Sequence, residues 1–216
     1  RGAWLFQAAS EAGATNTPLP PPPVATLLVS LGDTIDGGNG NDTLRGADGD
    51  DVVTDTGGNN LIESGLGNDS ILGGPANDTI RAGGGDDTVA GRGGDDLIDT
   101  GSGNDLIIWN GVGNGVDIVL DSNGTQALSI QGSTASNTFV VDSVASGDNT
   151  VLRVSEGVAS ITTSQTVGEV SIMGGGGDDM ITVNSIAQVR PQFLLIDGQA
   201  GNDTITAANA RIGRVF

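Results

Sequence analysis

Hydrophobic residues recur at every ninth position from residue 28 to residue 108. In each nine-residue block, six positions rich in Gly, Asn and Asp precede a short run with an aliphatic residue in its middle. The aliphatic residues of the eighth position are Ile35, Leu44, Val53, Ile62, Ile71, Ile80, Val89, Ile98 and Ile107. The polar positions predict a turn, and the aliphatic run predicts a short β-strand. An uninterrupted repeat of this kind predicts a stack of coils, each burying its aliphatic row against the next.

A row of acidic residues accompanies the aliphatic row, two residues before it in each block. The sixth positions hold Asp33, Asp42, Asp51, Asn60, Asp69, Asp78, Asp87, Asp96 and Asp105. Carboxylates stacked one coil apart repel one another unless a divalent cation lies between them. We therefore interpret the two rows as a metal-binding row and a core row written into the same repeat.

The repeat divides the chain into three parts: residues 1–27, residues 28–108 and residues 109–216. The third part has longer and unequal spacing. Three of its segments, 128–141, 170–183 and 194–207, read as strand, turn and strand, with Asn137, Asp179 and Asp203 in the sixth place of the turn. This pattern predicts wider coils that continue the stack as a less regular β-solenoid. A separate β-sandwich is the alternative.

The first 27 residues lie outside the repeat. Trp4, Leu5 and Phe6 form an apolar group on one or two predicted helical turns, and we expect this group to cap the open end of the first coil. Docking on a partner protein or a membrane surface is the alternative. Consecutive prolines at 20–23 favour an extended, semi-rigid spacer, and binding by a proline-recognition module is the other interpretation.

The amino-acid composition excludes several classes of function. The 216 residues carry a net charge of −19 and include no Cys or His, and all eight basic residues are Arg. Disulfides, zinc–thiolate sites and thiol chemistry are thereby excluded, and nucleic acid is a poor partner because the arginines make no basic stripe. No apolar run is long enough to span a membrane. Because the chain begins at Arg1, we expect an upstream portion to be missing or cleaved.

The blocks GGNGNDTLR (37–45), SGLGNDSIL (64–72) and TGSGNDLII (100–108) resemble the RTX nonapeptide G-G-x-G-x-D-x-U-x, the hemolysin-type calcium-binding repeat. The resemblance implies an all-β fold, a right-handed parallel β-roll in which two blocks make one coil. It also implies several Ca²⁺ ions between neighbouring turns. One edge would then collect Asp33, Asp51, Asp69, Asp87 and Asp105, and the other Asp42, Asn60, Asp78 and Asp96.

Carried over residue by residue, the resemblance implies two kinds of ligand, which suit the oxygen preference of calcium. The carboxylates are Asp33, Asp42, Asp51, Asp69, Asp78, Asp87, Asp96 and Asp105, with Asp179 and Asp203 added from the third part. The carbonyl donors are Gly38, Gly40, Gly65, Gly67, Gly83, Gly85, Gly101 and Gly103. About seven ions would fill the regular roll. Weak or empty sites are expected beside Asn60, where Asp55 and Thr56 also replace glycines, and near Asp33.

These features predict a secreted, extracellular or cell-surface module that folds on binding calcium. It would be part of a bacterial surface layer, filament, adhesin or larger assembly, with coil ends or the N-terminal segment contacting a protein partner or a second copy. A folding module for type I secretion, attached to a toxin or exoenzyme, is the alternative. We expect no enzyme activity, since the chain has no His, Lys, Tyr or Cys to serve as acid, base or activated nucleophile. Adjacent Asp178 and Asp179 would point apart.

Overall fold

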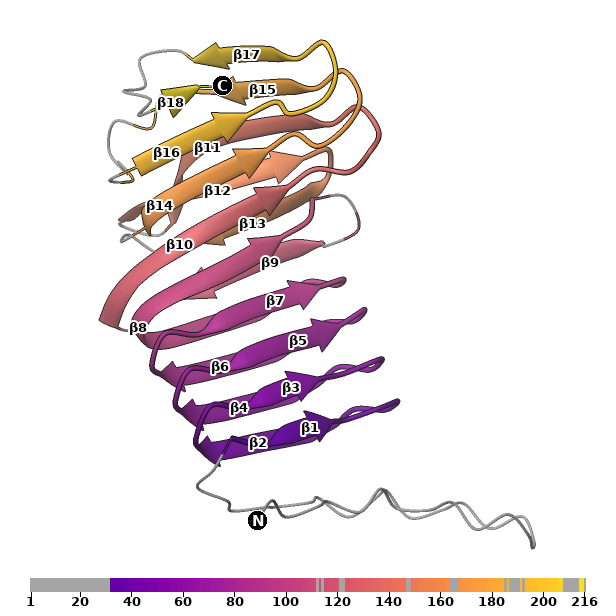
Figure 1. The fold of residues 1–216 in the computed structure, drawn as a ribbon, viewed down its shortest axis with the longest axis vertical. Helices are drawn as coiled ribbons and strands as arrows, with labels where there is room; N and C mark the ends of the chain where they lie inside the picture. The colour runs from indigo at the N-terminus through magenta and orange to yellow at the C-terminus, as the bar shows by residue number, and fades with distance from the viewer. Residues whose placement is uncertain are drawn as a thin grey trace, which may run out of the picture.

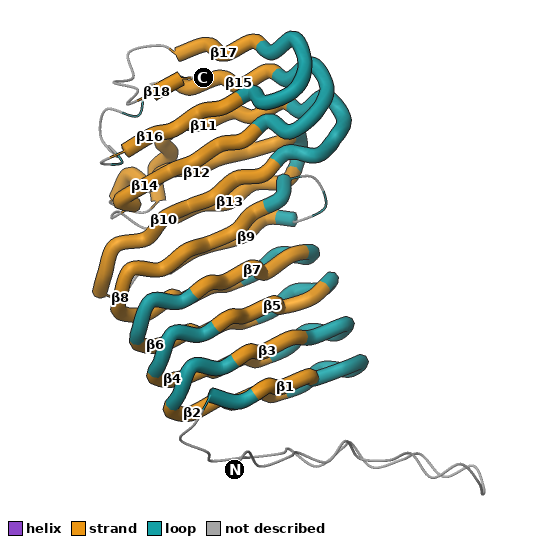
Figure 2. Tube along the Cα trace, in the orientation of Figure 1, coloured by secondary structure: helices purple, strands orange, loops and turns teal. Residues whose placement is uncertain are grey.

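The computed structural model describes residues 32–111, 113, 115–120, 123–146, 149–163, 167–184, 186, 191, 193–207 and 214–215. All the regular secondary structure in these ranges is β-strand, and the strands stack into one elongated body (Figures 1 and 2). Within the same ranges, no helix has the length and apolar character needed to cross a membrane. The cap and spacer predicted for residues 1–27 lie outside the described residues.

Eight strands form the regular part of the stack. They are β1 (Thr34–Asp36), β2 (Thr43–Asp48), β3 (Val52–Thr54), β4 (Leu61–Leu66), β5 (Ser70–Gly74), β6 (Thr79–Gly84), β7 (Thr88–Arg92) and β8 (Leu97–Trp109). Odd-numbered strands pair in parallel on one face, which we call the first face, and even-numbered strands pair on the second face. β8 is long enough to join both faces, pairing with β6 and with β7.

The register proves the coil length. Ile35 lies beside Val53 and Ile62 lies beside Ile80, so partners are 18 residues apart and two nine-residue blocks complete one coil. Equivalent positions of alternate blocks therefore stack directly on one another. The predicted parallel β-roll is confirmed.

The aliphatic row is the core of the roll. Val53, Ile62, Ile71 and Ile80 are all fully buried between the two faces. Burying each such side chain stabilises the fold by roughly 1.5–3 kcal/mol. Because each coil buries only one large aliphatic side chain per face, the core is thin and the coils depend on their neighbours.

Ten further strands extend the stack. They are β9 (Val116–Leu120), β10 (Asn123–Gln131), β11 (Thr138–Ser146), β12 (Asn149–Glu156), β13 (Ala159–Thr163), β14 (Val167–Met173), β15 (Met180–Val183), β16 (Phe193–Asp197), β17 (Thr204–Ala207) and β18 (Arg214–Val215). The first face continues in the order β8, β10, β14, β16, β18. The second face continues in the order β8, β9, β13, β12, β11, β15, β17. The predicted continuation as a less regular solenoid is confirmed, and the described strands form no separate sandwich.

One strand of the second face runs against the others. β12 is antiparallel to both β11 and β13, because β11, β12 and β13 form a meander within a single coil. Arg153 of β12 makes two hydrogen bonds to the carboxylate of Asp142 on β11, at 2.7 and 3.1 Å. Trp109, the last residue of β8, and Phe139 of β11 are both buried. Beyond the nonapeptide repeat, the core thus includes large aromatic side chains as well as aliphatic ones.

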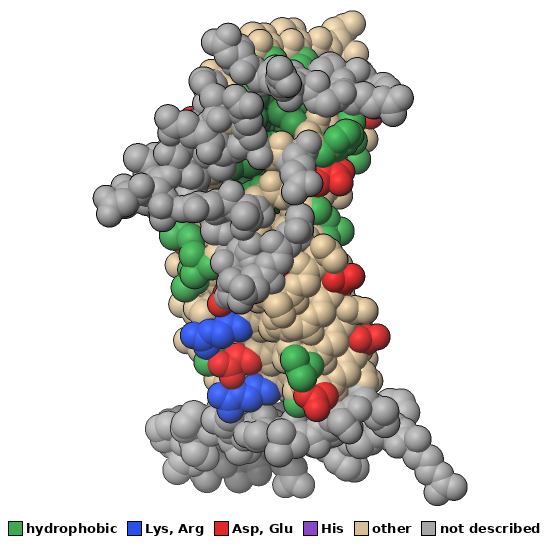
Figure 3. Space-filling model, turned by 90° about the vertical axis from the view of Figure 1, so that its left-hand side faces the viewer, with side chains coloured by type: hydrophobic (Ala, Val, Ile, Leu, Met, Phe, Trp, Pro, Cys, Tyr) green, Lys and Arg blue, Asp and Glu red, His purple; other side chains and the backbone are tan. Residues whose placement is uncertain are grey.

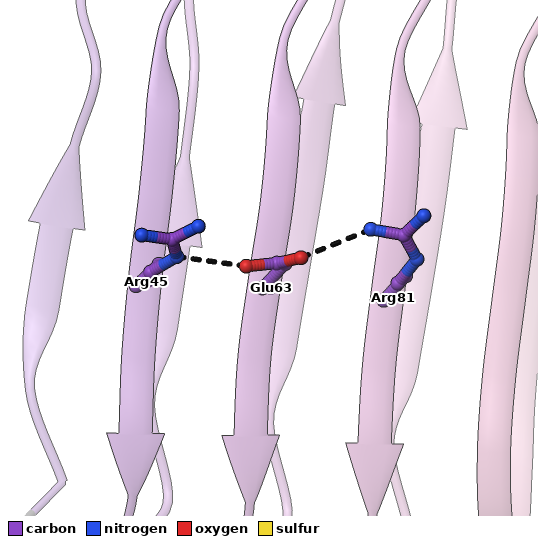
Figure 4. Close-up of polar contacts among 3 residues, drawn as sticks. All are labelled: Arg45, Glu63 and Arg81. Carbon is purple, nitrogen blue, oxygen red and sulfur yellow. Dashed lines mark hydrogen bonds and ion pairs between the residues drawn. The ribbon is translucent and has the colours of Figure 1, made fainter.

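A charge ladder crosses the outside of the second face in the regular roll. Figure 3 shows basic and acidic side chains stacked over the lower coils, and Figure 4 shows Arg45, Glu63 and Arg81 on neighbouring strands. Glu63 pairs with Arg45 at 2.7 Å and with Arg81 at 2.9 Å, and these pairs hold its pKa below the usual value. Exposed pairs of this kind contribute about 0.2–1 kcal/mol each. They favour the 18-residue register without needing a metal.

Candidate metal centre

The glycine-rich turns lie along the two long edges of the roll. Turns 37–42, 55–60, 73–78 and 91–96 connect the first face to the second, and we call their side the first edge. Turns 46–51, 64–69, 82–87 and 100–105 connect the second face back to the first along the second edge. In Figure 1 the arrowheads of β1, β3 and β5 point toward the first edge.

Backbone hydrogen bonds hold the sixth-position side chains in columns. In each pair, Oδ1 of one residue accepts the N–H of its equivalent in the coil before it, at 2.7–3.0 Å. On the second edge the column is Asp33, Asp51, Asp69, Asp87 and Asp105, and on the first edge it is Asp42, Asn60, Asp78 and Asp96. Each set of residues that the sequence assigned to one edge therefore forms a single column, and the two columns lie on opposite edges.

The second carboxylate oxygen of these aspartates has a different environment. Oδ2 of Asp42, Asp51, Asp69, Asp78, Asp87 and Asp96 is buried and accepts no hydrogen bond from the described residues. An ionised oxygen buried in this way is costly unless an opposite charge lies beside it. The same oxygen recurs at each coil, so the turns present regular anionic positions suited to cations between the coils.

Glycine backbone completes the turns. All eight glycines that were predicted as carbonyl donors have positive φ, between 82° and 139°: Gly38, Gly40, Gly65, Gly67, Gly83, Gly85, Gly101 and Gly103. The carbonyl oxygen of Gly65 lies directly against the place where a Cβ on Gly83 would sit, and Gly67 stands in the same relation to Gly85. Carbonyl oxygens thus face the neighbouring turn, where a side chain would displace them.

Two glycine variants separate conformational cost from crowding. Gly38 and Gly83 both have positive φ, but a Cβ on Gly38 would meet nothing within 4 Å, whereas one on Gly83 would meet the Gly65 carbonyl. We expect Gly38→Ala to cost about 1 kcal/mol and Gly83→Ala to cost about 1–3 kcal/mol more. Urea unfolding at saturating calcium measures both, and equal costs would show that coil contact at Gly83 is unimportant.

Burial and stacking raise the proton affinity of the column. The pKa of Asp78 is raised to about 6, and the pKa values of Asp87 and Asp96 are raised to about 7. Burial is the largest cause in each case, hydrogen bonds from backbone N–H groups oppose it, and neighbouring carboxylates add to it. Without a cation, these groups are therefore close to protonation at neutral pH. A bound cation would favour their charged form.

Asp117 extends the first-edge column and was missed by the sequence analysis. Its Oδ1 accepts the N–H of Asp96 at 3.0 Å, its side chain is 1 % exposed, and burial raises its pKa to about 7. Asp117 follows Asp96 by 21 residues instead of 18. Asp117 therefore falls outside the nine-residue frame, although it follows glycine-rich residues and precedes Ile118 and Val119, as the sixth-position aspartates precede their aliphatic residues.

The upper turns form a column of their own on the first edge. The N–H of Asn137 donates to Asp179 at 2.7 Å, and the N–H of Asp179 donates to Asp203 at 2.9 Å. Oδ2 of Asp179 is buried without a hydrogen-bond partner among the described residues, whereas Asp203 is half-buried. Asn137 donates from Nδ2 to Glu156 at 2.6 Å. The stacking neighbours of Asp179 and Asp203, which sequence left open, are thus each other and Asn137.

Side chains at the fifth position form a second ladder of hydrogen bonds, in which each side chain accepts from the following coil instead of the preceding one. Oδ1 of Asn41 accepts the N–H of Asn59 in the following coil, and Asn68, Asn77 and Asp86 repeat the pattern at 2.7–3.2 Å. These residues are exposed, and their side chains already serve the backbone. The fifth position therefore ties neighbouring coils together. At the sixth position, Oδ2 of Asp69, Asp78 and Asp87 has no hydrogen-bond partner among the described residues.

No group of three or more Asp, Glu, His or Cys side chains is gathered at one point in the described residues. The columns instead place one carboxylate per turn among carbonyl oxygens, and calcium takes six to eight oxygens of both kinds. The RTX calcium-binding nonapeptide repeat (4 copies) matches the chain at residues 30–54, 36–71, 46–80, 54–89, 72–107 and 195–209. No curated protein matches the chain.

Proposed function

Residues 30–107 make this chain an RTX repeat protein carrying calcium-binding repeats, and from that premise we propose that it is an extracellular structural or interaction module that folds on binding calcium. Its role would be to form part of a surface layer, a filament, an adhesin or an accessory subunit of a larger assembly. Coil ends would contact the partner, because unpaired strand edges favour association.

One observation carries this proposal: a column of buried carboxylate oxygens that accept no hydrogen bond from the described residues. Asp69, Asp78 and Asp87 each use one oxygen to hold the stack, and the other oxygen has no hydrogen-bond partner in the part of the chain that the structure describes. In a fold without cations those oxygens would cost free energy, whereas a divalent ion between coils would turn the same charges into an attraction. Extracellular calcium modules typically bind at about 10⁻⁴–10⁻³ M, which favours a location outside the cell.

The same residues support a non-enzymatic role. No His, Lys, Tyr or Cys is available in the chain to act as acid, base or nucleophile. Arg153, one of the few basic residues of the second half, is engaged by Asp142 through two hydrogen bonds. Asp87 and its equivalents are buried within the turns, where an extended substrate has no access.

The second candidate is a calcium-triggered folding module for type I secretion, attached to a toxin or exoenzyme. A net charge of −19 and acidic columns that oppose folding in low calcium favour it, since such a chain stays unfolded until it reaches calcium. The two candidates differ in what accompanies the solenoid. An effector domain encoded in the same open reading frame would support secretion, and a frame of solenoid and anchoring segments would support the structural role.

Adjacent acidic residues provide a matched test of calcium binding. Asp87 is buried in the column, whereas Asp86 is exposed and its Oδ1 accepts hydrogen bonds that an asparagine would also accept. Because each column carboxylate borders two gaps between coils, we expect Asp87→Asn to lower the calcium stoichiometry by about two ions. Asp86→Asn should leave it unchanged.

Equilibrium dialysis with calcium measures the stoichiometry, and magnesium serves as the competing ion because it prefers a tighter octahedral shell. Light scattering after gel filtration would show in the same samples whether calcium drives self-association. A parent chain that binds no calcium, or equal stoichiometry in the two variants, would contradict the proposal.

A further inference from the structure

The first and sixth positions of a turn share one space inside it. In turns 46–51, 73–78 and 91–96, Oδ2 of the sixth-position aspartate lies against the first-position glycine, where a Cβ would sit. The glycines are Gly46, Gly73 and Gly91, and all are buried. In these three turns a side chain at the first position would crowd the carboxylate. In the other turns of the second edge, Ser64, Ala82 and Thr100 hold the first position beside Asp69, Asp87 and Asp105.

Turn 55–60 exchanges the two residue types. Its first position holds Asp55 and its sixth position holds Asn60. Asn60 still keeps the column, since its Oδ1 accepts the N–H of Asp42 at 2.9 Å. Its Nδ2 donates to the carbonyls of Gly58, at 2.9 Å, and Gly73, at 3.4 Å. Gly73 belongs to the next coil, so the neutral amide bridges the gap on that side.

Asp55 restores the missing charge on the other side. Its side chain is 7 % exposed, and its Oδ1 accepts the N–H of Gly57 at 2.7 Å. Its Oδ2 is buried, has no hydrogen-bond partner among the described residues and lies against Gly37 in the preceding coil. Turn 37–42 of that coil contributes Asp42, whose Oδ2 is equally buried and without a partner in the same residues. Two such oxygens therefore belong to neighbouring turns at one gap.

We propose that a divalent cation binds between turns 37–42 and 55–60, with Asp55 supplying from the first position the carboxylate that Asn60 lacks at the sixth. Asp42 provides the second carboxylate, and glycine carbonyls of the two turns complete the oxygen shell. This inference rests on the proposed calcium-binding function. The sequence predicted weak or empty sites on both sides of Asn60. Under this proposal only the gap toward Gly73 is without an ion, because the Asn60 amide bridges it, and the gap toward Asp42 holds an ion.

Asp55→Asn tests the site against Asp48→Asn, which removes the same charge from an exposed position in turn 46–51 on the second edge. In equilibrium dialysis with calcium, we expect the Asp55 variant to bind one ion fewer than the parent and to lose more thermal stability at saturating calcium. The Asp48 variant should match the parent. Equal stoichiometry of the parent and the Asp55 variant would overturn the inference, whereas a parent without bound calcium would overturn the proposed function itself.

A double variant keeps the test decisive if Asp55→Asn does not fold. Asp55→Gly combined with Asn60→Asp returns the acid to the sixth position and removes the amide bridge. If the parent already holds an ion at the Asp42 gap, the double variant gains only one ion, at the gap toward Gly73. A gain of two ions would mean that the parent holds none at Asp55, which would overturn the inference.

Discussion

In a chelator, the chain is expected to lose most of its β-structure, and millimolar calcium is expected to restore it. The reason lies in the columns, where carboxylates such as Asp69 and Asp87 are stacked in adjacent coils. Two unit charges about 4 Å apart repel by about 4 kcal/mol at an effective dielectric constant of 20. Glycine-rich turns add a large loss of conformational entropy on folding. The thin aliphatic core has to offset both.

Calcium reverses this balance. An ion present at ten times its dissociation constant stabilises the folded state by about 1.4 kcal/mol at each site. Several sites acting on one roll therefore contribute as much as the whole stability of a typical domain, about 5–15 kcal/mol. Metal binding and folding become a single transition, as expected when the site does not exist in the unfolded chain.

Far-ultraviolet circular dichroism with and without chelator measures this transition, and gel filtration gives the accompanying change in hydrodynamic radius. Magnesium at the same ionic strength is the control for screening of charge. We expect the regular roll to respond most, since the upper coils bury Trp109 and Phe139 as well as aliphatic residues. Identical spectra in chelator and in calcium would refute coupled folding.

The sequence predicted the roll because each block repeats the same two constraints at the same interval. Ile62 and Ile80 had to face the core, and Asp69 and Asp87 had to share an edge, once 18 residues were taken as one coil. Nothing in that reasoning needed tertiary contacts. Where the interval is constant, the pattern of one block is enough to predict how successive coils stack.

The parts that sequence could not predict lie where the interval changes. Asp117 joins the first-edge column after three additional residues, and β12 reverses direction because a coil of the third part takes in a meander. From the sequence, Asp55 is interpreted only as the replacement of a turn glycine, which predicts a weaker metal site. Only the position of its carboxylate against Gly37, beside an amide that turns toward Gly73, shows that the charge has moved within the turn.

Acidification is expected to stabilise the metal-free roll. Asp87, Asp96 and Asp117 have folded-state pKa values of about 7, above the ordinary aspartate value of about 3.9. Between these limits the folded chain binds more protons than the unfolded chain, so the free energy of unfolding falls as pH rises. The contribution of these groups is fully present below about pH 4 and is lost as pH rises through about 7.

Saturating calcium should invert this dependence, because the ion requires ionised carboxylates and competes with the proton for them. We expect far-ultraviolet circular dichroism of the dialysed, calcium-free protein to show more β-structure at pH 5 than at pH 7.5, and the thermal midpoint of the calcium-loaded protein to be higher at pH 7.5 than at pH 5. In the Asp87→Asn/Asp96→Asn variant the metal-free dependence should flatten, since two of the titrating groups are gone. A metal-free β-structure content that rises from pH 5 to pH 7.5 would mean that burial does not control the pKa values of these carboxylates. Proton and calcium would thus act on one set of oxygens, and each would stabilise the roll mainly by offsetting the cost of burying the same uncompensated charges.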